Sequence, residues 1–346
     1  MNTPIRQVLI VGPSWVGDMV MAQSLFSVLK QRHQALHIDV LAPAWSRPLL
    51  TRMPEIRNAL ELPLSHGELK LTQRYQLGRS LRASGYEWSI VLPNSFKSAL
   101  VPFWARIPQR TGYVGELRLG VLNDVRRLDK ARLPMTVQRF MALGLPPGDP
   151  LTSPPFPTPH LTVDAAAVAR SLECLGLRPP ARLLALCPGA EFGPAKRWPP
   201  EYFAEIARRK QAQGWTVWVF GSVRDANAAR VVCELAGKDC VNLAGRTRLD
   251  EAIDLLSLAS VVLTNDSGLM HIAVALNRPL VALYGSSDPR FTPPLSRAAR
   301  IEYLGLPCSP CFKPACPLGH LDCLKKLKPD RVMASLDQLL EARGLN

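Results

Sequence analysis

The stretch VVLTNDSGLMHIAVALNRPLVALYG (261–285) decides the fold class of this chain. Its two short apolar runs, 261–264 and 280–284, flank a segment of helical pattern that begins near Ser267. Short apolar runs that alternate with helical segments are typical of βαβ units, whose strands form a parallel sheet. The stretch therefore predicts an α/β fold in which helices cover the faces of a parallel sheet.

The same alternation continues through both halves of the chain. The expected strands are 7–12, 37–42, 59–62, 89–93, 110–113, 183–187, 216–220, 241–243, 261–264 and 280–284. The expected helices cover 18–32, 44–52, 71–84, 95–105 and 329–343, and others begin near Pro199, Val223, Leu249 and Ser267. This order of elements predicts two doubly wound, Rossmann-like domains.

A proline-rich stretch, LPPGDPLTSPPFPTPH (145–160), separates the two series of elements. Seven of its residues are proline, which cannot continue a helix and stiffens an extended segment. We expect a first domain at 1–150, a linker at 151–160 and a second domain at 161–330, followed at 331–346 by a helix that packs back on the first domain. Two such domains place a ligand cleft between them, at the carboxyl ends of the strands.

The composition is that of a folded, basic protein. Of 346 residues, 47% are hydrophobic and 20% are charged, so the formal net charge of +14 does not come from a disordered tail. Residues 70–140 hold thirteen Lys and Arg against four Asp and Glu, which is +9 of the excess. The charge predicts a polyanionic partner: nucleic acid, nucleotide phosphates or an anionic membrane face.

The sequence carries no obvious membrane or export signal. No apolar run reaches the roughly 18 residues that span a bilayer, and residues 1–7 are polar and lead directly into a strand. We therefore expect a soluble, cytoplasmic protein. Nucleic-acid binding is an alternative reading of the charge, but no helix-turn-helix, RRM or KH signature supports it.

The first strand-to-helix turn, GPSWVGDM (12–19), brings a carboxylate to the expected cleft. Its two glycines have the spacing of a Walker A loop, but Asp18 and Met19 stand where Lys and Ser or Thr are required. The G-x-G-x-x-G of a nicotinamide dehydrogenase is also missing, which disfavours that class of enzyme. Asp18 is either a helix cap or a general base aimed at a hydroxyl, and both roles are compatible with its position.

A second loop, CPGAEFGPAKRWPP (187–200), has the composition of a diphosphate site. Gly189 and Gly193 permit close approach of the backbone, and Lys196 and Arg197 supply two cations. Pro199 suits the first turn of a helix. A loop of this kind ahead of a helix N-terminus predicts a diphosphate site, and the alternative is an ordinary loop with solvated cations.

The turn TNDSGLMH (264–271) follows another strand and opens a helix. Asp266 or Ser267 can cap that helix, and Gly268 leaves backbone amides open to an anion. His271 falls in the first turn. Considered singly, Asp266 is a cap and His271 a core histidine. Segments 187–200 and 264–271 both lie at carboxyl ends of strands in one sheet, and this shared position favours a binding site.

Six segments together resemble the ADP-heptose:lipopolysaccharide heptosyltransferases, a glycosyltransferase family. They are GPSWVGDMVMAQSL (12–25), APAWSRPLL (42–50), LPNSFKSALVPF (92–103), RTGYVGELRLGVLNDVR (110–126), CPGAEFGPAKRWP (187–199) and TNDSGLMHIAVALNRPLVALYG (264–285). The resemblance runs through both halves and is specific to the members that add the second heptose. It implies a GT-B fold, in which two Rossmann-like domains face each other across a cleft. Addition of the first or of a later heptose is the alternative.

The resemblance also implies substrates and roles for residues. The donor would be ADP-L-glycero-D-manno-heptose and the acceptor heptosyl-Kdo2-lipid A, with inversion, at the cytoplasmic face of the inner membrane. Asp18 would deprotonate the acceptor 3-hydroxyl, and Lys196 would stabilise the departing diphosphate. The implied donor-binding residues are Gly189, Ala190, Glu191, Lys196, Gly221, Ser222, Thr247, Asp266, Ser267, Gly268, Leu269 and His271. The acceptor-binding residues we expect are Ser14, Trp15, Asn94, Lys97 and Arg110, and the +9 segment would meet the anionic glycolipid and membrane surface.

Two predictions concern metal ions. No paired acidic motif for a catalytic metal is present, so we expect no required cofactor, although stimulation by Mg²⁺ is compatible with the site. Four of the eight cysteines lie within sixteen residues, as Cys308-x2-Cys311-x4-Cys316-x6-Cys323. This spacing is ligand-like and makes structural Zn²⁺ the natural candidate, with reduced or redox-sensitive thiols as the alternative.

Overall fold

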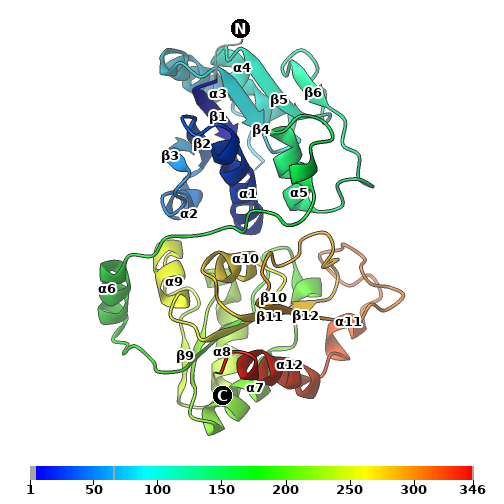
Figure 1. Ribbon diagram of the computed structural model, residues 1–346. Helices are drawn as coiled ribbons and strands as arrows, with labels where there is room; N and C mark the ends of the chain where they lie inside the picture. Colours follow the sequence, from blue (N-terminus) through cyan, green and yellow to red (C-terminus); the bar gives the residue numbers. More distant parts are fainter. Residues whose placement is uncertain (1–4, 65–66, 345–346) are drawn as a thin grey trace. The chain divides into compact units, whose positions relative to one another are not determined.

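The computed structural model describes residues 5–64 and 67–344, which form two compact units. The chain divides between Pro159 and His160, at the end of the proline-rich stretch. The stretch belongs to the first unit because it is bonded to it: Ser24 Oγ donates to the Pro157 carbonyl at 2.7 Å, and Arg32 pairs with Asp149. The two units are described separately below (Figure 1).

The first unit contains a parallel sheet with the strand order β3-β2-β1-β4-β5-β6. Its strands are β1 (Gln7–Val11), β2 (His37–Pro43), β3 (Ile56–Leu62), β4 (Trp88–Val91), β5 (Gln109–Tyr113) and β6 (Asp124–Arg126). The α-helices are α1 (Val16–Arg32), α2 (Arg47–Leu50), α3 (Leu71–Ser80), α4 (Leu100–Trp104) and α5 (Thr136–Leu143). Helix α1 packs on α5, and α3 packs on α4.

The second unit repeats this architecture with the order β12-β11-β10-β7-β8-β9. Its strands are β7 (Leu183–Cys187), β8 (Thr216–Val219), β9 (Cys240–Asn242), β10 (Val261–Asn265), β11 (Leu280–Tyr284) and β12 (Ala299–Tyr303). Its helices are α6 (Ala165–Leu175), α7 (Pro200–Ala212), α8 (Ala226–Ala236), α9 (Leu249–Leu256), α10 (Gly268–Ala275), α11 (Asp322–Lys325) and α12 (Pro329–Glu341). Both units thus have the doubly wound order 3-2-1-4-5-6, which confirms the predicted α/β class.

The central strands are apolar throughout because a parallel sheet is covered on both faces. All five residues of β7, β10 and β11 are buried. Helix α12 adds Val332, Leu336 and Leu340 to the core of the second unit. The apolar face of this C-terminal helix is thus used within the second unit, and its predicted packing on the first domain stays a prediction.

Several short elements do not follow from the apolar pattern. Strands β6 and β12 and helices α5 and α6 were not among the elements predicted from the sequence. The burial of β6 is intermediate, and two of the five residues of β12 are exposed, as expected at sheet edges where few apolar residues are needed. Within residues 5–64 and 67–344, no helix is both long and apolar enough to cross a membrane.

Candidate active site

Each sheet has one topological switch point, where the chain reverses its direction of winding. In the first unit it lies between β1 and β4, and in the second between β7 and β10. Ligands of doubly wound proteins bind at the carboxyl ends of the strands at this point. The predicted catalytic residues follow these strands: Asp18 comes after β1, and Lys196 comes after β7.

The loop after β1 places Asp18 in the first turn of α1. The helix begins at Val16, and its N-cap, Trp15, makes no side-chain capping bond. Asp18 is therefore inside the helix and not its cap, and the helix dipole favours its negative charge. A Cβ atom on Gly12 would lie 2.7 Å from Met19 Cε, so glycine lets the strand approach the helix closely. Trp15 is 48% exposed, and Ser14 and Asp18 are half-buried.

The loop after β4 carries Asn94 and Lys97. Asn94 is exposed, and its carbonyl accepts a hydrogen bond from the Glu116 backbone N–H at 3.3 Å. The buried Arg74 donates to the Lys97 carbonyl at 3.2 Å, which fixes the backbone beneath the lysine. The buried Arg118 donates to the Pro93 carbonyl at 2.6 Å and to the Tyr113 carbonyl, so it ties the ends of β4 and β5 together.

Arg110 has a bracing role in the structure. Its guanidinium donates to the Val121 carbonyl at 2.7 Å and to the Ile107 carbonyl at 2.6 Å, and it lies over the Phe103 ring. Burial lowers the pKa of Arg110. These bonds hold the loop before β6, and the predicted acceptor contact of Arg110 stays a prediction.

In the second unit, the structure brings Lys196 and Asp266 together. Lys196 Nζ lies 2.5 Å from Asp266 Oδ2, and Ser287 Oγ donates to the same oxygen at 2.5 Å. The lysine side chain is 17% exposed and the aspartate 5%. Lys196 Nζ also lies 5.1 Å from the centre of the Phe192 ring. The ammonium is thus fixed by a carboxylate, while the lysine side chain as a whole keeps partial exposure to solvent.

Asn265, at the end of β10, fixes the loop that carries Lys196. Its side chain is fully buried and donates to the Pro188 carbonyl at 2.7 Å. Its Oδ1 accepts from the Trp198 backbone N–H at 3.1 Å. The two bonds clamp both ends of segment 188–198 to the next strand of the sheet. The sequence analysis missed this role, because Asn265 reads only as a turn residue beside Asp266.

His271 lies in α10, which begins directly after Ser267. The pKa of His271 is lowered to about 4, mainly by burial; Asp266 opposes the shift and the charge of Lys196 adds to it. The ring is therefore neutral at physiological pH. Ser267 is the N-cap and makes no side-chain capping bond, and the half-buried residues Gly268 and Leu269 open the helix. Asp266 is consequently not the cap but the partner of Lys196.

The Asp225 side chain packs directly against Gly189 and Gly221, the glycines that follow β7 and β8. It accepts from the Ser222 backbone N–H at 2.9 Å and from Ser222 Oγ at 2.8 Å. A Cβ atom on Gly189 would lie 2.3 Å from Asp225 Cγ, and one on Gly221 would lie 2.8 Å from Asp225 Cβ. Both positions therefore require glycine. Asp225 is a further residue that the sequence analysis did not single out.

The remaining predicted donor-site residues occupy the same edge of the sheet. Ala190 is buried and its carbonyl accepts from Arg197 at 3.1 Å. Glu191 is exposed and pairs with Arg224. Thr247 is half-buried after β9, and its hydroxyl donates to the Leu243 carbonyl at 3.4 Å.

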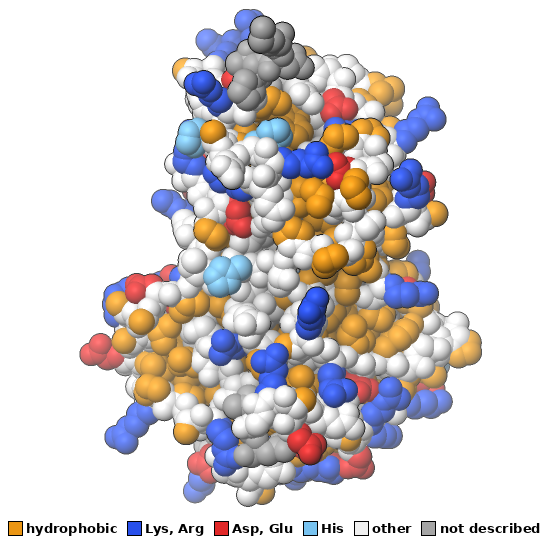
Figure 2. Space-filling view, viewed as in Figure 1, with side chains coloured by type: hydrophobic (Ala, Val, Ile, Leu, Met, Phe, Trp, Pro, Cys, Tyr) orange, Lys and Arg blue, Asp and Glu red, His pale blue; other side chains and the backbone are white. Residues whose placement is uncertain are grey.

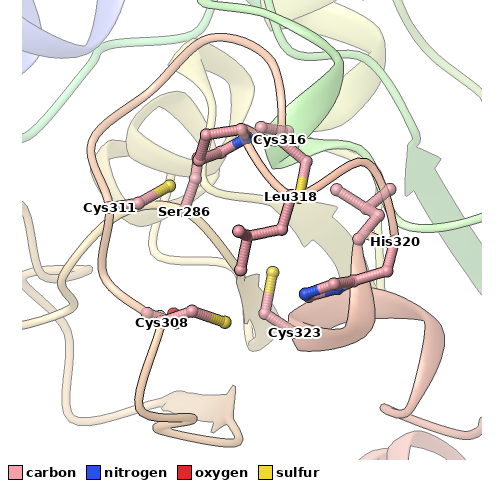
Figure 3. Close-up of a pocket in the computed structure, with 11 residues that line it drawn as sticks. Ser286, Cys308, Cys311, Cys316, Leu318, His320 and Cys323 are labelled. Carbon is pink, nitrogen blue, oxygen red and sulfur yellow. The ribbon is translucent and has the colours of Figure 1, made fainter.

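The four clustered cysteines line one pocket in the second unit, together with Ser286 and His320 (Figure 3). The backbone N–H of Leu321, with those of residues 318–320, lowers the pKa of the Cys316 thiol. Burial and the neighbouring thiols raise the pKa of Cys323 to about 11. As the side chains lie, no three His, Cys, Asp or Glu among the described residues are close enough to hold a metal ion. The zinc site stays a prediction.

On the face seen in Figure 2, the basic side chains do not gather into one patch. Figure 2 shows Lys and Arg scattered over the visible face of both units. Several cations of residues 70–140 are used internally, since Arg74, Arg110 and Arg118 hold backbone carbonyls, and Arg126 also pairs with Asp124. The +9 of this segment therefore overstates the charge available to a partner.

A lysine and glycine-shaped loops at the switch point of a doubly wound sheet are the features of a site for a phosphorylated ligand. The sequence profile described as glycosyltransferase family 9 (heptosyltransferase) matches residues 74–322. The chain belongs to this family.

Similar proteins extend over nearly the whole chain. It is 47% identical over 342 residues to lipopolysaccharide heptosyltransferase 2 of Escherichia coli K12, covering 96% of this chain and 98% of the relative. It is 48% identical over 310 residues to lipooligosaccharide heptosyltransferase 2 of Haemophilus influenzae, covering 85% and 87%. The solved structure of E. coli ADP-heptose LPS heptosyltransferase II is 44% identical, with a TM-score of 0.86 over 98% of this chain and 99% of that one. The predicted family and the assignment as a heptosyltransferase of lipopolysaccharide synthesis are confirmed.

Proposed function

We propose that the protein transfers L-glycero-D-manno-heptose from its ADP derivative to the first heptose of heptosyl-Kdo2-lipid A, with inversion at the anomeric carbon. The assignment of the donor-binding site rests on one observation, the Lys196–Asp266 ion pair at the switch point of the second sheet. The choice of acceptor is supported by two relatives whose names are heptosyltransferase 2.

In this proposal, the second unit binds the donor. Negative charge develops on the ADP diphosphate as the bond between its phosphate oxygen and the heptose breaks, and the Lys196 ammonium stabilises that charge. Backbone amides at the start of α10, after Ser267, add donors for the phosphates. The neutral His271 offers hydrogen bonding to the donor without adding charge. Because a lysine and a helix terminus perform this role, we propose that no metal is required and that Mg²⁺ at most stimulates.

The first unit supplies the general base. Asp18 accepts the proton of the acceptor 3-hydroxyl while that oxygen bonds to the anomeric carbon and ADP departs. The dipole of α1 favours the negative charge of a carboxylate in its first turn, which is the form a general base needs. Ser14, Trp15, Asn94 and Lys97 lie in the loops after β1 and β4, beside the same switch point, and are the proposed contacts to the acceptor.

We also propose that the first unit meets the anionic membrane surface in which the acceptor is anchored, at the cytoplasmic face of the inner membrane. The loop between β5 and β6 exposes three apolar side chains: Leu117 is 91% exposed, Leu119 is 77% and Val114 is 55%. Exposed apolar residues within a basic segment are typical of peripheral membrane contacts.

The decisive experiment offers ADP-heptose to purified Kdo2-lipid A acceptors that carry zero, one or two heptoses. We expect turnover only with the acceptor that carries one heptose. The product should have the inverted anomeric configuration. Preference for the acceptor with no heptose or with two would replace the proposal by addition of the first or a later heptose. Salt-sensitive oligonucleotide binding without turnover would instead favour the nucleic-acid alternative.

A further inference from the structure

We propose that Cys308, Cys311, Cys316 and Cys323 form a thiolate site for one soft divalent cation of the Zn²⁺ type. We further infer that this site fixes the segment 304–321 against the loop that carries Lys196. The segment connects β12 to α11 and contains neither helix nor strand, although the structure describes all of it. Such a long irregular segment is uncommon in a compact domain unless it has a function or is held by a further constraint.

The four thiols lie around one small cavity. They come from the segment and from α11, and Figure 3 shows the sulfur atoms of Cys308, Cys311 and Cys323 turned toward the space that they line. The cavity volume of about 20 Å³ has room for one ion or water molecule and not for an organic ligand. A single-ion site is the occupant that matches this size and these side chains.

A buried polar group points to the same occupant. Ser286 lines the cavity, is 1% exposed, and its Oγ has no hydrogen-bond partner within the described part of the chain. Buried hydroxyls are almost always paired, so an unpaired one beside a cavity indicates a missing partner. His320 Nδ1 already accepts from the Asp322 backbone N–H at 2.9 Å, which leaves the four thiols as the donor set.

Closing the thiolate site requires rotation of side chains. The thiols are not yet close enough to hold an ion. Cys308 is exposed and Cys311 and Cys316 are half-buried, so rotation of these side chains can close the site without displacing the core. On binding, the four thiols would release four protons to solvent and the sulfurs would bond to the cation.

The same segment supports both sides of the Lys196–Asp266 pair. The Pro314 carbonyl accepts from the Ala195 backbone N–H at 2.9 Å, next to Lys196. A Cβ atom on Gly193 would lie 2.3 Å from the Pro314 oxygen, which shows how tightly the two backbones meet. On the other side, the Phe312 backbone N–H donates to the Ser286 carbonyl at 2.7 Å, and the next residue, Ser287, holds Asp266. A cation that orders the segment therefore orders the lysine.

The test uses the full chain purified with a reductant and without chelators. Elemental analysis should find about one zinc, or another soft metal, per chain. After removal of the metal, competition with a chromogenic chelator should give a Zn²⁺ Kd of the order of 1 nM or tighter. Co²⁺ should produce the thiolate charge-transfer absorption of a tetrahedral sulfur site. Metal-free protein that takes up neither ion, or that binds Zn²⁺ no more tightly than micromolar, overturns the site.

Matched variants locate the ion. Cys308→Ser and Cys316→Ser change surface thiols of the segment, and each should weaken Zn²⁺ binding at least about 100-fold while the circular dichroism spectrum is kept. Cys174→Ser changes an exposed thiol on α6 and should bind Zn²⁺ like the parent. Equal Zn²⁺ affinity in all three variants would overturn the assignment of the ligands, as would a disulfide among the four cysteines in the reduced preparation.

The link to Lys196 has a separate readout, which rests on the proposed function. Removing the metal should raise the Kd for ADP about 5-fold or more, and added Zn²⁺ should restore it in the parent chain but not in Cys316→Ser. An unchanged Kd for ADP with full metal occupancy would overturn the link. If the metal-loaded chain binds no ADP at all, the donor assignment fails, while the metal content still decides the thiolate site.

Discussion

Lys196 Nζ lies 2.5 Å from Asp266 Oδ2 although seventy residues separate the two in the sequence. The carboxylate also accepts from Ser287 Oγ, and it is almost fully buried. The ammonium is therefore held in place before any substrate arrives. Preorganised charge stabilises a transition state more effectively than charge that must reorganise during the reaction. In the proposed mechanism, this preorganised lysine would stabilise the charge of the leaving diphosphate.

Lys196→Ala should lower kcat/KM for ADP-heptose about 100- to 1000-fold, because the charge that stabilises the leaving diphosphate is lost. Steady-state kinetics with a fixed acceptor concentration measure this effect. Lys238→Ala removes an exposed lysine that follows α8 and should leave the kinetics unchanged. A parent-like rate in Lys196→Ala would exclude the diphosphate role.

Asp18→Asn should reduce kcat about 100- to 10000-fold and leave the Kd for ADP-heptose nearly unchanged, because the general base is lost while the donor site in the second unit stays intact. Calorimetric titration gives the donor affinity, and single-turnover kinetics give the rate. Glu61→Gln, on the exposed edge strand β3, is the control. Normal turnover in Asp18→Asn would remove this residue as the base.

Asn265→Ala should lower the free energy of unfolding by about 2 to 4 kcal/mol. The substitution leaves the Trp198 N–H and the Pro188 carbonyl without their partner in a buried position. Urea denaturation measures the loss, and Asn227→Ala on the surface of α8 should cost far less. Activity should fall with stability, because the clamped loop carries Lys196. An unchanged midpoint would mean that the clamp is unimportant.

His271 should make the protein less stable as the pH falls from 6.5 to about 4. Burial lowers its folded-state pKa to about 4 from the ordinary 6.5, and the nearby Lys196 charge lowers it while Asp266 raises it. In this window the unfolded chain binds a proton that the folded chain does not, so stability rises with pH.

The comparison of urea denaturation at several pH values isolates this effect. His271→Gln cannot titrate, so its stability should fall less steeply between pH 6.5 and 4 than that of the parent. His33→Gln, an exposed histidine after α1, should keep the parent slope. If the parent and His271→Gln have the same slope, His271 is not buried in the neutral form.

Leu117→Asp combined with Leu119→Asp should weaken binding to vesicles that contain anionic phospholipids about 10-fold or more, because two exposed apolar contacts are replaced by charges of the same sign as the lipids. Vesicle co-sedimentation measures the change. Val223→Asp alters a 76% exposed residue of the second unit and should not affect binding. Identical sedimentation of all variants would place the membrane contact elsewhere.

Most of the site could be placed from the sequence because its residues follow strands. Once 7–12, 183–187 and 261–264 are read as parallel strands, Asp18, Lys196 and Asp266 must lie at their carboxyl ends. Residues that act through buried hydrogen bonds could not be found in this way. Asp225 lies in a short 3-10 turn and Asn265 is the last residue of β10. Nothing in the neighbouring sequence indicates that Asp225 packs against two glycines or that Asn265 clamps a loop.

The sequence by itself determined the α/β class, the two-part organisation and the family, because these depend on apolar periodicity and on contiguous motifs. Only the tertiary structure decided the partners of individual charges. Asp266 proved to be an ion-pair partner and not a cap, Arg110 a brace, and the C-terminal helix a part of the second unit. The physical reason is that periodicity reports which face of an element is buried, whereas hydrogen bonds and ion pairs depend on distances between segments that are far apart in the chain.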